Sequence, residues 1–124
     1  MATENRAAGP RPFELPVPVA LAKLAGNLEA VPHLNQPVFE PKWDGYRALA
    51  AGGRLYSRRG TDLTRYFPDL APVLAARLPT DLVLDGEIVA WDTATGRLDF
   101  ASLQARLTAG NRIASVSALS LIHI

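Results

Sequence analysis

Short apolar runs separated by turn residues fill residues 38–58, and they constrain the fold more than any other feature of the sequence. Asp44-Gly45 and Gly52-Gly53 divide this stretch into runs at residues 38–42, 46–51 and 54–58. Asp-Gly and Gly-Gly are strong hairpin signals, because these residues tolerate the positive φ angles of tight turns. The sequence therefore predicts an antiparallel meander of three strands.

Two helices and three further short strands are predicted after the meander. Apolar side chains recur at helical spacing at Phe67, Leu70, Leu74 and Leu78. Pro68 suits a first helical turn, and Pro72 predicts either a kink or a late start. Strands are expected at residues 82–84, 88–91 and 97–100, with Asp85-Gly86 as a break. A second helix from residue 100 turns its leucines inward and Gln104 and Arg106 to water. These elements predict an α+β fold of antiparallel sheets with packed helices.

Composition limits the size and the class of protein that this chain can form. With 124 residues and 48% hydrophobic side chains, the chain can form one modest domain or part of a larger one. It has no cysteine, which excludes a disulfide framework and cysteine zinc sites. No apolar run is long enough to span a bilayer, and no secretory leader is present. We expect a soluble cytoplasmic protein without a membrane partner. Residues 1–18, rich in proline and alanine, are expected to be a disordered lead-in, and residues 19–25 to pack against the domain.

Charge is unevenly distributed along the chain although the net charge is only +1. Residues 40–65 contain six basic and three acidic side chains, whereas residues 81–99 contain five acidic and one basic. A basic segment followed by an acidic one is suited to phosphates and a divalent cation. The alternative is a pair of oppositely charged, solvated faces.

Lys42 lies at the end of the first predicted strand, with Arg47 on the far side of the turn. A lysine amine is a nucleophile when it is deprotonated, and cationic neighbours favour that state. The planar guanidinium groups of Arg47, Arg58 and Arg59 are also well shaped for phosphate oxygens. This combination suits nucleotidyl transfer, in which the amine displaces pyrophosphate. The alternative is a surface hairpin with solvated charges.

The segment Lys42-Trp43-Asp44-Gly45-Tyr46-Arg47 resembles the K-x-D-G-x-R acceptor motif of ATP-dependent DNA ligases. Residues 57–64 and 84–89, and then residues 65–68 and 100–107, resemble bacterial members of the same family in the family's order. The resemblance covers about residues 17–112. It implies an ATP-grasp-like nucleotidyltransferase domain, the adenylation domain of a DNA ligase, in truncated form.

The resemblance also implies a role for individual residues. Lys42 would be the catalytic residue that becomes lysyl-AMP. Nucleotide-binding residues would be Glu40, Lys42, Arg47, Arg58 and Glu87, and Glu87 would also bind the metal. DNA-binding residues would be Arg58, Arg59 and Asp85. ATP would be the AMP donor, Mg²⁺ the cofactor, and nicked double-stranded DNA the partner.

The end of the chain differs from the family pattern. The later motifs of the ligases have no counterpart here, so we expect residues 19–112 to be the N-terminal part of an adenylation domain that is inactive alone. Residues 113–124 form an apolar tail whose only ionisable side chain is His123, and we hypothesise that it is not native. The alternatives are an RNA ligase or capping-type guanylyltransferase, or an inert nucleic-acid-binding fragment.

Overall fold

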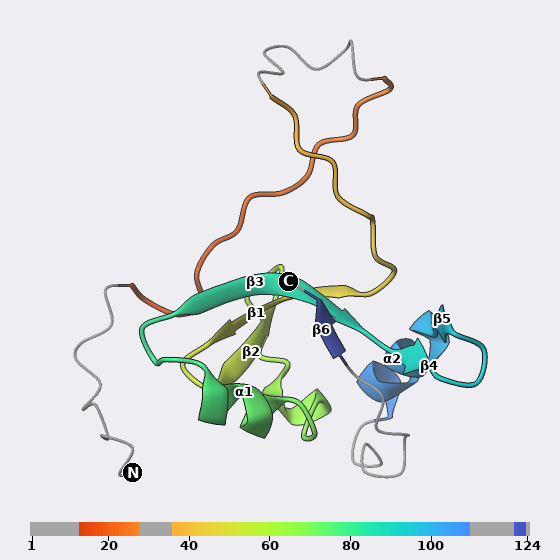
Figure 1. The fold of residues 1–124 in the computed structure, drawn as a ribbon. Coiled ribbons are helices and arrows are strands. Elements are labelled where there is room, and N and C mark those ends of the chain that lie inside the picture. Colours follow the sequence, from red (N-terminus) through yellow and green to blue (C-terminus); the bar gives the residue numbers. More distant parts are fainter. Residues whose placement is uncertain (1–12, 28–35, 110–120, 124) are drawn as a thin grey trace, which may run out of the picture.

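The computed structural model describes residues 13–27, 36–109 and 121–123 of the chain (Figure 1). A four-stranded antiparallel sheet, in the order β2-β1-β3-β6, forms its centre. These strands are β1 (Tyr46–Ala51), β2 (Arg54–Ser57), β3 (Val83–Val89) and β6 (Leu121–His123). A separate two-stranded sheet contains β4 (Trp91–Asp92) and β5 (Arg97–Leu98). With two α-helices packed beside it, the sheet confirms the α+β, antiparallel class.

The turn between β1 and β2 forms as predicted, at Gly52 and Gly53. Both glycines have positive φ, 56° and 75°, so both use the conformational freedom that the sequence indicates. The preceding prediction, a strand at residues 38–42, is wrong. Those residues are exposed and unpaired with the sheet, since Pro37 precedes them, Pro41 lies among them, and proline cannot donate to a ladder. β1 pairs instead with β3 along its whole length.

β3 also differs from expectation, because it runs without a break through Asp85 and Gly86. Each β3 residue from Val83 to Ile88 has a partner in β1, and Gly86 lies opposite Ala48. This continuous ladder outweighs the weak strand propensity of aspartate and glycine. The region is therefore one seven-residue strand with two carboxylates near its middle.

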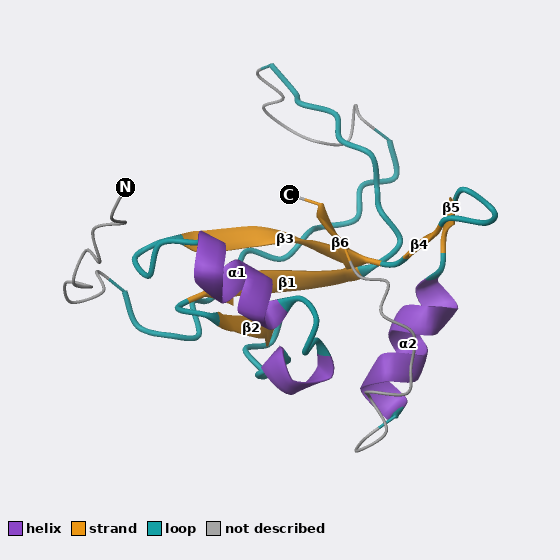
Figure 2. Ribbon diagram, turned by 60° about the horizontal axis from the view of Figure 1, so that its bottom comes forward, coloured by secondary structure: helices purple, strands orange, loops and turns teal. Residues whose placement is uncertain are grey.

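The hydrophobic core lies on one face of the sheet. Its largest fully buried side chains are Phe67, Leu55, Ile88 and Leu103. α1 (Ala71–Arg77) covers this face and α2 (Phe100–Thr108) lies beside it (Figure 2). Pro72 stands in the first turn of α1, which confirms the late start. A short 3-10 helix, η1 (Thr64–Tyr66), precedes α1. In the part of the chain that is described, no helix could cross a membrane.

Arg106 of α2 was expected to face water and is instead 4% exposed. It follows Leu103 by three residues, so it lies on the same inward helix face. Its Nη1 and Nη2 donate to the two carboxylate oxygens of Asp69 at 2.6 and 3.0 Å. Its guanidinium carbon lies 5.7 Å from the ring centroid of Phe67. The ion pair with Asp69 therefore compensates the buried charge of Arg106, and it ties α2 to the turn before α1.

We expect Arg106→Ala to lower the free energy of unfolding by about 2–3 kcal/mol, because it removes a buried ion-pair partner and its packing. Arg54→Ala is the matched control, since Arg54 pairs with Asp62 at 2.8 Å while 61% of its side chain is exposed. That change should cost less than about 1 kcal/mol. Urea denaturation followed by circular dichroism measures both, and equal losses would contradict a special role for the buried pair.

Candidate active site

All seven residues that the sequence analysis assigned to the site line one cavity of about 990 Å³. They come from three separate parts of the chain: the motif segment before and in β1, the turn after β2, and β3. The seven are Glu40, Lys42, Arg47, Arg58, Arg59, Asp85 and Glu87. The fold thus brings together side chains that are up to 47 positions apart in the sequence.

The register of β1 against β3 determines which side chains meet in this cavity. Arg47 lies opposite Glu87, and Asp85 lies two residues before Glu87 in β3. Neighbouring Ala48 and Ile88 are buried in the core. Because strand side chains alternate between faces, Arg47, Asp85 and Glu87 all lie on the face opposite the core. One face of the sheet therefore carries the core, whereas the other carries the charged groups together with the buried side chains of Leu49, Ala51 and Val89.

Gly45 is required at this site for a reason that differs from the sequence prediction. Its φ is not positive, so the turn does not use its conformational freedom. The constraint is space: a Cβ at this position would clash with the backbone oxygen of Ile88 and lie 2.9 Å from Cγ of Glu87. The missing side chain lets the motif segment approach β3 closely, which brings Lys42 toward Glu87.

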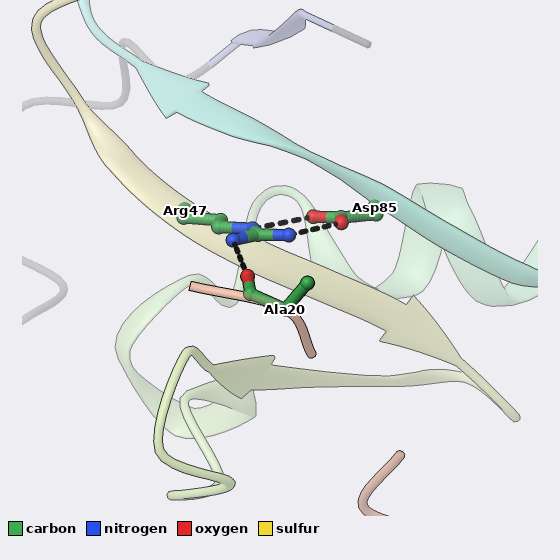
Figure 3. A network of polar contacts seen from close by, with 3 residues as sticks. All are labelled: Ala20, Arg47 and Asp85. Atoms are coloured by element: carbon green, nitrogen blue, oxygen red, sulfur yellow. Dashed lines mark hydrogen bonds and ion pairs between the residues drawn. The ribbon is translucent and has the colours of Figure 1, made fainter. Parts of the chain in front are cut away.

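Arg47 is held by a bidentate ion pair with Asp85 (Figure 3). Its Nε donates to Oδ1 at 3.0 Å and its Nη2 to Oδ2 at 2.7 Å. Its Nη1 donates to the backbone oxygen of Ala20 at 2.6 Å. The hydrogen bonds with Asp85 raise the pKa of Arg47 and lower that of Asp85. Both groups are therefore charged throughout the neutral range.

The pKa of Glu87 is shifted in the opposite direction from that of Asp85. Burial raises the pKa of Glu87 above its ordinary value, and the positive charges of Lys42 and Arg47 partly oppose that rise. The negative charges of Asp44 and Asp85 add to it. A partly buried carboxylate whose charge is disfavoured, next to a lysine, is a candidate functional group.

Comparison with known proteins identifies the family. The family described as the ATP dependent DNA ligase domain matches residues 20–122. The chain belongs to the ATP-dependent DNA ligase family.

Several individual proteins are similar to this chain. DNA ligase C2 of Mycolicibacterium smegmatis is 43% identical over 84 residues, which are 64% of this chain and 23% of that protein. DNA ligase C of Mycobacterium tuberculosis is 40% identical over 101 residues, 77% of this chain and 27% of that protein. The solved ligase domain of M. tuberculosis LigD is 42% identical, with a TM-score of 0.41 over 52% of this chain and 23% of that one. The chain spans about a quarter of the length of the curated relatives it matches.

Lys42 lies in the segment before β1, which contains no helix or strand, and not at a strand end. Lys42 and Glu40 are exposed at the cavity, and Trp43 beside them is half-buried and also lines it. Trp43 was not assigned to the site, although its place inside the motif was a signal for it. Ala22 and Leu107 line the cavity too, and nothing in their sequence context indicates this.

The turn after β2, which carries Arg58 and Arg59, is organised by Ser57. The Ser57 hydroxyl oxygen accepts hydrogen bonds from the backbone N–H groups of Arg59 and Thr61, at 3.2 and 3.0 Å. Gly60 completes the turn with a φ of 82°. Both arginine side chains are exposed, so their guanidinium groups are available to anions in the cavity.

A magnesium ion would meet a limited set of protein ligands in this site. Among the described residues, no group of three or more carboxylate or histidine side chains is arranged to hold a metal. Asp85 is engaged with Arg47, which leaves Glu87 as the carboxylate on this sheet face that could bind one. Mg²⁺ is commonly held by one or two carboxylates together with substrate phosphates and water, so the donor set fits that mode.

We expect Gly45→Ala to destabilise the protein by about 1–3 kcal/mol, because the added methyl group overpacks the contact with β3. Gly26→Ala is the matched control, since nothing lies within 4 Å of a Cβ at that position. Thermal unfolding of both variants measures the difference. Equal melting temperatures would contradict the close approach.

We expect Glu87→Gln to stabilise the protein near neutral pH in a buffer without divalent ions. The folded-state pKa of Glu87 is raised, so its contribution to stability is fully present below its ordinary pKa of 4.5 and is lost as the pH rises through the folded-state value. Glutamine cannot ionise and avoids that loss. Unfolding measured between pH 4 and pH 8 should show the two proteins diverging as pH rises, and parallel curves would argue against a buried charge.

Proposed function

We propose that this chain contributes the acceptor lysine and part of the nucleotide cavity to an ATP-dependent DNA ligase. The observation that carries the proposal is the single cavity into which the fold brings Lys42, Glu87 and the Arg58–Arg59 turn. Belonging to the ligase family supports the same reaction. Because the chain spans about a quarter of its relatives' length, the complete reaction is proposed for a full-length enzyme.

In the first step the Lys42 Nζ attacks the α-phosphorus of ATP. A phosphorus–nitrogen bond forms, the bond to the β-phosphate oxygen breaks, and pyrophosphate leaves while the amine loses its proton to solvent. An oxygen of the 5′-phosphate at a nick in double-stranded DNA then attacks the same phosphorus, the phosphorus–nitrogen bond breaks, and the Lys42 amine takes up a proton as AMP moves to the DNA. Finally the neighbouring 3′-hydroxyl attacks that phosphate, AMP leaves, and the strand is sealed.

Four further side chains have a proposed role that their charge and place support. The Arg58 guanidinium is proposed to bind nucleotide or DNA phosphates, and Arg59 to bind the DNA backbone. Glu40, which is exposed beside Lys42, is proposed to contact the base. Glu87 is proposed to bind the ribose and to hold Mg²⁺, which when bound offsets negative charge on phosphate oxygens.

A chimera tests the proposal, with residues 20–109 replacing the matched segment of M. tuberculosis DNA ligase C. Incubated with ATP labelled at the α-phosphate, the chimera should retain label after denaturing electrophoresis and should seal nicked DNA. Lys42→Ala should abolish both, because the acceptor amine is gone. Lys23→Ala is the control: Lys23 is the chain's other lysine and is exposed outside the lining of the cavity.

Two outcomes would change the assignment. Nick sealing by the Lys42→Ala chimera at the unaltered rate would reject Lys42 as the acceptor. Stable label from GTP but not from ATP would instead favour a capping-type guanylyltransferase, which shares the acceptor lysine but not the nucleotide.

A further inference from the structure

The segment 16–22 lies between two cavities, although it contains no helix or strand. Ala22 lines the large cavity that contains Lys42. Residues 16–19 and Leu21 line a second cavity of about 390 Å³. Arg58 and Arg59 line both cavities. The segment and the arginine turn therefore both border the two cavities.

Two contacts hold this segment on the protein. Near its start, Pro16 lies against the turn after β2, where a Cβ on Gly60 would come within 2.8 Å of its Cγ. Near its end, the backbone oxygen of Ala20 accepts a 2.6 Å hydrogen bond from Nη1 of Arg47. The second contact is charge-assisted, which makes it about twice as strong as a neutral hydrogen bond.

The guanidinium of Arg47 is committed to these protein contacts. Each of its three nitrogens donates to a protein oxygen, two to Asp85 and one to Ala20. If Arg47 turned to bind a phosphate, it would leave the Asp85 carboxylate unpaired in the same cavity. That negative charge would repel the phosphate. The geometry therefore favours an arginine that stays paired while a nucleotide binds.

We propose that Arg47 is a positioning residue that clamps residues 16–22 against the sheet, and that Asp85 orients Arg47 instead of contacting DNA. The clamp has a second effect, because the pair neutralises Asp85 on a surface that phosphates approach. The identity of the ligand in the cavity rests on the proposed function, whereas the clamp itself does not.

A spin label on Leu21→Cys tests the clamp in the full chain. The chain has no cysteine of its own, and Leu21 is 64% exposed, so a label there is specific and tolerated. In Arg47→Lys, in Asp85→Asn and in the double variant, the spectrum should shift to a more mobile form by the same amount. The equal effect is expected because the three variants break one connected network. A label on Val73→Cys, exposed on α1, is the control and should not change.

Titration with ATP separates a clamp from a direct ligand. A clamp predicts that Arg47→Lys and Asp85→Asn weaken ATP binding by a similar factor, about tenfold, and that the double variant is no weaker. A direct ligand predicts that Asp85→Asn frees the guanidinium and leaves ATP binding equal or tighter.

The spin-label result decides the proposal independently of the result of the ATP titration. Unchanged mobility at position 21 in both single variants would overturn the clamp, and so would equal loosening at position 73, which would show a general loss of structure. If no variant and no wild-type protein bound ATP while position 21 loosened as expected, the clamp would stand and the proposed function would fail.

Discussion

The pairing of β1 with β3 is the constraint on which both the core and the site depend. It is a six-residue antiparallel register in which Tyr46 and Ile88 face the core while Arg47 and Glu87 face the cavity. A slip of one residue would exchange the two faces, moving charges into the core and apolar side chains into the site. The register is thus enforced by hydrophobic burial, and the geometry of the charged groups follows from it.

The close approach at Gly45 extends this constraint beyond the strands. The motif segment reaches β3 there because no side chain separates them. Lys42 precedes Gly45 in the motif segment, and Glu87 lies across from it in β3. Their opposite charges interact, so that the charge of Lys42 acts to lower the pKa of Glu87. The backbone contact at Gly45 therefore determines how close the charged groups of the site lie, although the glycine itself takes no part in any reaction.

Local features of the fold could be predicted from the sequence, whereas features that depend on distant partners could not. The Gly52–Gly53 turn and the late start of α1, with Pro72 in its first turn, have local causes in backbone geometry. Burial of Arg106 depends on Asp69, which lies 37 positions earlier, and the unbroken course of β3 depends on its ladder with β1. Propensity and spacing carry no information about such partners.

The same distinction applies to the site. Its charged members could be named from their motifs, because charge and motif spacing are written in the sequence, and the structure places all seven at one cavity. Their individual roles stay proposals. The contact of Arg47 with the backbone oxygen of Ala20 could not be predicted, since every residue has such an oxygen and only the path of the chain selects one.

The turn at Arg58 and Arg59 borders both cavities, so neither space can change its outline without altering the other. Any anion that draws these two guanidinium groups toward one side removes positive potential from the opposite side. The positive charge of this turn is therefore shared between the two spaces and does not belong to either one alone.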